Sequence, residues 1–188
     1  MIGPAQVNSP IWVPPKLAHR IRRLGSVLGA VTLAAALLVG IGMPVIGPVL
    51  PTATGPVTML TTSAGVFLGL FLAVSGVTMT MARGWVSLGR HAGGTGFLFD
   101  ARPAATGAIV LVAGAVGSIL SALFFLTSYT ANITWTGGPH ATNVHPVTPP
   151  IALFLLLPVL AVGLTLVNLV VGWPLFRPSQ RTIQRYAR

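Results

Sequence analysis

The chain has 188 residues, of which 11 are Lys or Arg, 1 is Asp or Glu and none is Cys. Hydrophobic residues make up 53% of it and charged residues 6%, whereas soluble domains carry about 25% charged residues. This composition excludes an ordinary soluble domain and a disordered chain, and the lack of Cys excludes disulfides and thiolate metal sites.

Two long stretches without formal charge, 24–82 and 103–176, organise the chain. Because a membrane helix needs about 20 apolar residues, each stretch is long enough for two helices. Prolines and glycines interrupt the first stretch around 44–56 and the second over 132–150, and such breakers belong outside the hydrocarbon. We therefore predict an all-α integral membrane protein with four transmembrane helices. These helices are expected near 24–44, 57–82, 104–130 and 150–175.

The basic residues lie before the first predicted helix, between the second and third, or after the fourth. They are Lys16, Arg20, Arg22, Arg23, Arg83, Arg90, Arg102, Arg177, Arg181, Arg185 and Arg188. The positive-inside rule predicts that this side, with both termini, is cytoplasmic and that the protein is a multi-pass protein of the inner (plasma) membrane. The expected organisation is a Pro-rich and basic N-terminal segment (1–23), a transmembrane domain (24–176) and a basic tail (177–188). The first helix is expected to be a retained signal anchor, since its apolar run exceeds that of a signal peptide.

Small residues recur at helical spacing in each predicted helix, which keeps them on one face. The positions that we select are Gly25, Gly29, Gly40, Gly65, Gly69, Gly107 and Gly114. Such faces let helices approach closely in lipid, so they indicate either packing within one bundle or docking on another membrane subunit. Asn168 is the one amide well inside a predicted span, and we expect it to donate a hydrogen bond to a neighbouring helix.

The sequence lacks the sets of ionisable residues that catalysis or ion-coupled transport requires. No predicted span contains an ionisable group, which argues against ion-coupled transport. The single acid, Asp100, is expected to cap the third helix or pair with a nearby Arg. His140 and His145 lack a third zinc ligand, and the glycines at 93–96 lack the rest of a phosphate loop and indicate a flexible turn. We expect no enzyme activity, no cofactor, no metal and no nucleic-acid partner.

Interfacial residues are expected at the ends of the spans. Trp85, Tyr129 and Trp173 stand where amphipathic rings meet headgroups. In the tail, basic residues repeat at spacings of four, four and three: Arg177, Arg181, Arg185 and Arg188. Like charges at this spacing repel each other on a helix, so the stripe predicts either anionic lipid or an acidic partner protein opposite it.

The Ala-, Val-, Gly- and Leu-rich spans, such as 27–39, and the use of Arg in place of nearly all Lys look like a high-GC actinobacterial protein. Four spans with cytoplasmic termini and no catalytic set resemble small accessory subunits of mycobacterial membrane assemblies. The accessory subunit of the Mce lipid-uptake transporter is the most similar, followed by small subunits of the respiratory supercomplex. The resemblance implies a non-catalytic subunit that stabilises or regulates a lipid or fatty-acid permease within a larger membrane complex. The alternatives are an accessory subunit of a respiratory-chain supercomplex and a stand-alone, homo-oligomeric channel or transport component.

Overall fold

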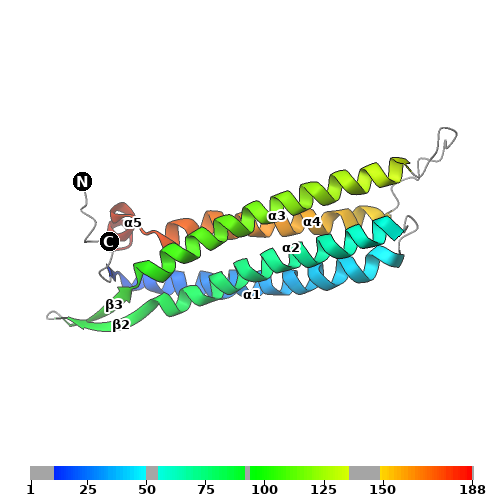
Figure 1. The fold of residues 1–188 in the computed structure, drawn as a ribbon. Helices are drawn as coiled ribbons and strands as arrows, with labels where there is room; N and C mark the ends of the chain where they lie inside the picture. The colour runs from blue at the N-terminus through cyan, green and yellow to red at the C-terminus, as the bar shows by residue number, and fades with distance from the viewer. Residues whose placement is uncertain (1–10, 50–54, 92–93, 136–148, 188) are drawn as a thin grey trace.

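The computed structural model is an elongated bundle of four long helices with a small β-sheet and a short helix at one end (Figure 1). The structure describes residues 11–49, 55–91, 94–135 and 149–187. The chain runs up and down the bundle, so neighbouring helices are antiparallel and both ends of the described chain lie beside the sheet (Figure 1). We call this the basic end of the bundle, because the described Lys and Arg residues gather there.

The prediction of four long apolar helices is confirmed. They are α1 (Pro15–Ile46), α2 (Gly55–Met81), α3 (Ala101–Trp135) and α4 (Pro149–Phe176). All four are long and apolar enough to cross a membrane, which is compatible with a multi-pass membrane protein. The start of α1 lies well before the predicted position 24, because Pro15 stands at the first helical turn, where its fixed φ favours helix formation. The basic residues of the N-terminal segment therefore lie on the first turns of a helix.

The prediction of an all-α fold missed a small antiparallel sheet. It consists of β1 (Ile11–Val13), β2 (Val86–His91) and β3 (Gly94–Phe99), in the order β1-β3-β2. Residues predicted as a flexible turn around Gly94 and Gly96 belong instead to the β2–β3 hairpin. The apolar residues Val86 and Leu88 alternate with Ser87 and Gly89, which is a strand pattern.

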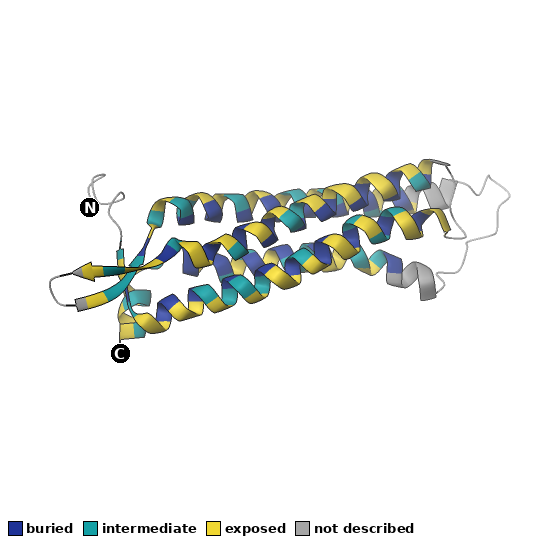
Figure 2. Ribbon diagram, turned by 90° about the horizontal axis from the view of Figure 1, so that it is seen from below, coloured by how far each residue is buried: buried dark blue, intermediate teal, exposed yellow. Residues whose placement is uncertain are grey.

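Each long helix turns one stripe of residues inward and the opposite stripe outward (Figure 2). The outward stripes are rich in exposed Leu, Val and Ile, so the bundle is apolar outside as well as inside, as lipid requires. The core has one cluster towards the far end, around Phe125 and Phe154, and a second at the basic end, around Ile21 and Phe99. Tyr129, expected at the headgroup level, is instead fully buried with Phe125 and Phe154.

Helices α1 and α2 approach each other most closely. A Cβ atom added to Gly69 would lie 2.7 Å from the Cα atom of Gly40, and one added to Gly25 would lie 2.6 Å from the carbonyl oxygen of Met79. Both distances are shorter than real carbon atoms adopt, so glycine is required at these positions. The seam between α1 and α2 is therefore built on backbone contact, as expected for helices packing in lipid.

Candidate functional site: the basic end of the bundle

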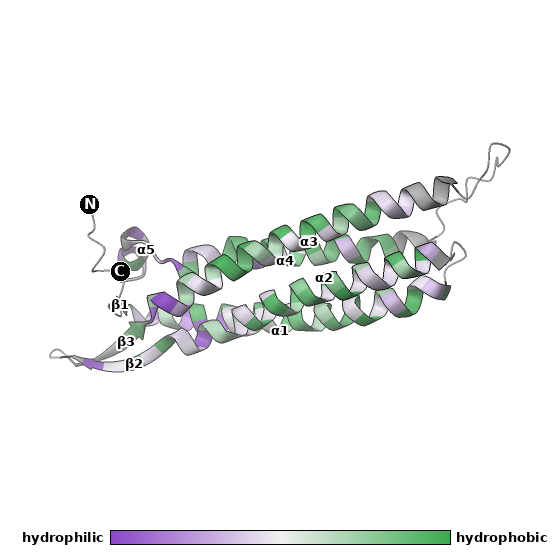
Figure 3. Cartoon of the chain, viewed as in Figure 1, coloured by the Kyte–Doolittle hydropathy of each residue, from purple (hydrophilic) through white to green (hydrophobic). Residues whose placement is uncertain are grey.

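Hydrophilic residues concentrate at the basic end, whereas the shaft of the bundle is apolar (Figure 3). The first turns of α1 hold the sheet there. Arg22 donates a hydrogen bond from its guanidinium to the carbonyl oxygen of Val86 (2.8 Å) and lies over the ring of Phe97, 5.6 Å from its centroid. The ring of His19 meets Phe97 edge-on at 5.5 Å, and Phe99 is fully buried beneath. These contacts hold the base of the sheet against the start of α1.

Strand β2 lies at one edge of the sheet, and its backbone geometry shows which groups face outward. The amide of Asp100 donates to the carbonyl oxygen of Trp85 (2.9 Å), next to the Val86–Phe99 pair. Because hydrogen-bonded and non-hydrogen-bonded pairs alternate in an antiparallel ladder, Val86–Phe99 is a non-hydrogen-bonded pair. The backbone N–H and C=O groups of Val86 and Leu88 therefore point away from β3.

Arg22 occupies only the base of this edge, through the carbonyl oxygen of Val86. Further out, the backbone groups of Leu88 and Arg90 point outward, and no strand pairs with this side within the described parts of the chain. The side chain of Leu88 is 70% exposed. The hairpin projects beyond the bundle (Figure 1). This open edge is the segment of β2 from Leu88 to Arg90.

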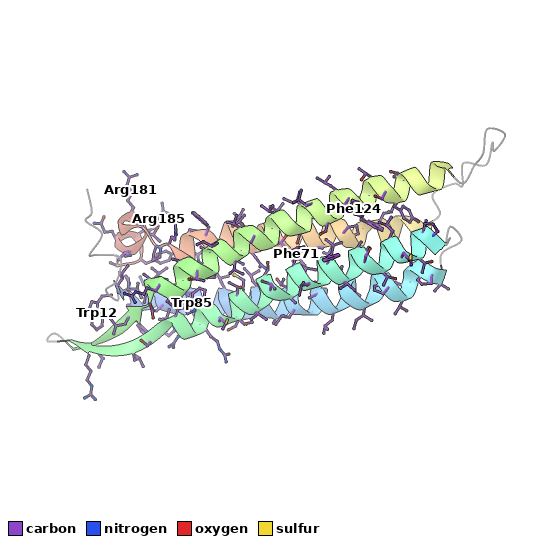
Figure 4. All side chains as sticks on the ribbon, viewed as in Figure 1. Trp12, Phe71, Trp85, Phe124, Arg181 and Arg185 are labelled. Carbon is purple, nitrogen blue, oxygen red and sulfur yellow. The ribbon has the colours of Figure 1, made fainter. Side chains whose placement is uncertain are left out.

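The basic tail forms a helix at the same end. Helix α5 (Gln180–Ala187) packs Ile183 and Tyr186 against the core cluster of the basic end. The hydroxyl of Tyr186 accepts a hydrogen bond from Arg20 of α1. Arg181 and Arg185 are exposed on α5 and point away from the sheet (Figure 4). Arg188, the last member of the predicted stripe, lies outside the described residues.

Asp100 is used for helix capping. It directly precedes α3, and its Oδ1 atom accepts a hydrogen bond from the backbone N–H of Arg102 (3.2 Å). A carboxylate at a helix N-terminus also interacts favourably with the helix dipole. The single acid of the chain is thus engaged in starting α3, which is one of the two roles expected for it.

Each long helix carries at least one polar side chain that is buried inside the bundle. Nδ2 of Asn168 donates to Oγ1 of Thr32 (2.8 Å), so α4 and α1 are linked as predicted for Asn168. Ser75 lies beside Gly114 of α3, one turn before Ser118 on the same face. Oδ1 of Asn168 and the hydroxyls of Ser75 and Ser118 are buried without a hydrogen-bond partner.

The predicted small-residue faces all turn into the bundle. Gly40 is half-buried, and the other selected glycines are buried: Gly25, Gly29, Gly65, Gly69, Gly107 and Gly114. A Cβ atom at Gly65 would lie 2.6 Å from Cδ of Pro44. Gly107 receives the ring of Trp85, which also meets Phe176 edge-on at 4.6 Å. The structure therefore uses these glycines for packing within the chain.

His140 and His145 lie outside the described residues. Within the described ranges, no group of three or more His, Cys, Asp or Glu side chains could hold a metal ion. Comparison with protein-family models, with curated proteins and with solved structures finds no match to this chain. The site is consequently defined by its own geometry. The open edge was missed from the sequence, although the alternating apolar residues of β2 could have indicated it.

Proposed function

We propose that this chain is a non-catalytic accessory subunit that stabilises or regulates a larger complex in the plasma membrane. The observation that carries the proposal is the open edge of β2. Unpaired strand edges template pairing with other chains, and proteins that work alone usually protect them with charges, prolines, bulges or covering elements. Here Arg22 covers only the base, and Leu88 at the open edge is largely exposed.

An extended segment of a larger partner would add to this edge as a further strand. In such complexes the backbone hydrogen bonds supply affinity and alternate side chains supply specificity. Leu88 offers an apolar contact. Arg90, two residues further along β2, offers a positive charge. The preferred partner segment is therefore extended, apolar and acidic.

The packing of the bundle supports contact at the basic end over contact along the shaft. Close helix association in lipid relies on small residues, and the small-residue faces of α1 to α4 pack against one another. The stripes that face outward carry mainly bulky aliphatic side chains, which suit lipid. We accordingly assign the partner contact to the basic end.

The side of the membrane and the kind of complex extend the same proposal. The positive-inside rule assigns the basic end and both termini to the cytoplasm. The resemblance to accessory subunits of mycobacterial assemblies favours a lipid or fatty-acid transporter as the complex. The chain itself would then contribute contacts and no chemical step.

Purification of the tagged full chain in a mild detergent, followed by mass spectrometry, tests this function. A larger integral membrane protein should be recovered with it. Recovery of a lone monomer, together with unchanged lipid uptake in a deletion strain, would contradict the proposal. Recovery of a pure homo-oligomer that conducts ions would replace it with the stand-alone channel.

A further inference from the structure

We propose that the outward face of the α4–α5 junction, built from Trp173, Arg177 and Arg181, binds the headgroup of an anionic phospholipid. The proposal is independent of the proposed function, since a chain without any protein partner could hold such a lipid. It is carried by the position of the tryptophan, the fixed arrangement of the arginines and the shortage of carboxylates.

The tryptophan and the first arginine form one unit at the end of α4. The backbone N–H of Arg177 donates to the carbonyl oxygen of Trp173 (3.0 Å), which extends the last helical turn. The guanidinium of Arg177 lies over the indole ring, 5.1 Å from its centroid. A cation stacked on a tryptophan face is held by the ring quadrupole, so Arg177 is positioned before any ligand arrives.

The second arginine is held by the docking of α5. The chain turns after Pro178, and Oγ of Ser179 accepts the backbone N–H of Thr182 (3.2 Å) at the start of the helix. Ile183 and Tyr186 then anchor α5 on the core of the basic end. Because this apolar side is fixed, the opposite side of α5 presents its arginines outward (Figure 4).

Carboxylate side chains that could neutralise these charges are scarce in this chain. It has 11 Lys and Arg residues and 1 Asp or Glu, and that acid, Asp100, caps α3 through Oδ1. Arg177, just after α4, and Arg181, on α5, are both exposed, and like charges close to each other repel. An anion from outside the chain therefore lowers the energy of this arrangement.

The surroundings of Trp173 favour lipid over an acidic protein. Along α4, the exposed face runs from Leu166 through Val170 to Trp173 and then to Arg177. This order, from aliphatic to indole to guanidinium, follows the change from hydrocarbon to headgroup region, where Trp is enriched. Trp173 is 43% exposed. A protein that met only the arginines would leave the exposed part of that ring uncovered.

Native mass spectrometry of the purified full chain tests the site. The protein is mixed with equal amounts of phosphatidylglycerol and phosphatidylcholine that carry identical acyl chains, and the lipid retained in the gas phase is counted. The wild type should retain mainly phosphatidylglycerol. In the double variant R177Q/R181Q, the ratio of retained phosphatidylglycerol to phosphatidylcholine should fall roughly 30-fold. Each arginine near a membrane surface contributes about fivefold to this ratio.

The matched control is R23Q/R83Q, which removes the same charge from exposed positions on α1 and just after α2. It should keep the preference within about twofold. Equal losses in the two double variants would overturn the proposal, because the attraction would then depend on total charge alone. An equal thermal unfolding temperature for the two variants shows that neither loss comes from misfolding.

Two further outcomes would assign the site to another ligand. If R177Q/R181Q keeps its phosphatidylglycerol but loses an acidic protein in mild-detergent purification, the arginines serve a protein partner and the proposal is wrong. If millimolar inorganic phosphate displaces the lipid completely, the site recognises phosphate rather than a membrane lipid. Retention of phosphatidylglycerol in excess phosphate, together with its loss in R177Q/R181Q, supports the proposal.

Discussion

At the scale of single residues, the buried hydrogen bond of Asn168 shows how much can be predicted from one amide in a long apolar helix. The sequence indicates that Asn168 needs a partner, because an unpaired amide is costly in lipid. It does not identify Thr32, which lies on a helix far away in the chain and is one of many Thr and Ser residues in the spans. Only the packing of α1 against α4 brings their side chains to 2.8 Å.

The hydrogen bond between these residues predicts a non-additive pair of substitutions. T32V keeps the shape of the side chain but leaves Nδ2 of Asn168 buried without an acceptor, so we expect a loss of about 1 kcal/mol in the free energy of unfolding. The double variant T32V/N168L removes both polar groups and should recover most of that loss. Reversible unfolding in mixed detergent micelles measures both values. Additive losses would show that the two residues are not coupled.

At the scale of elements, the α1–α2 seam predicts which glycines tolerate a methyl group. G69A would place a Cβ atom 2.7 Å from the Cα atom of Gly40, so the helices must separate, and we expect a loss of about 1–3 kcal/mol. G163A is the matched control on α4, because a Cβ atom there meets no other atom within 4 Å. Its effect should stay within about 1 kcal/mol. Similar losses in the two variants would contradict close packing at this seam.

The elements also show where prediction from sequence succeeds. Hydropathy and charge placed the four spans, because the bilayer fixes the length of an apolar helix. The small-residue spacing identified the inward faces but not their use, since glycines suit packing within a chain and between chains equally well. The pairing of β1 with β3 has no local pattern, because β1 is short and β3 lies far away in the sequence. The β2–β3 hairpin is local, and the alternation in β2 was its signal.

At the scale of the whole molecule, the grouping of charges predicts the orientation. A reporter that is active only outside the cytoplasm should work when fused at Thr54, between α1 and α2 in the sequence, or at Thr142, between α3 and α4, but not at Gly94 in the hairpin. The expected contrast is a clear signal against background, because the positive-inside rule acts on all three basic segments in the same direction. Activity at Gly94 would reverse the orientation and move the proposed lipid site to the outer leaflet.

The open edge of β2 makes the central claim, that a larger partner covers this end, directly testable. L88P removes an outward-facing backbone N–H, which an edge strand tolerates, so the hairpin itself should persist. The same substitution should prevent a partner strand from pairing there. L88S is the matched control, because it removes the apolar side chain but keeps the backbone donor.

The deciding measurement is the amount of partner protein recovered with the tagged chain, compared among wild type, L88P and L88S. We predict that L88P lowers recovery at least tenfold, while L88S lowers it only severalfold, since the backbone hydrogen bonds of strand addition supply most of the affinity. Equal recovery of a larger membrane protein with L88P and with wild type, or no such protein with wild type, would contradict a partner bound at this edge.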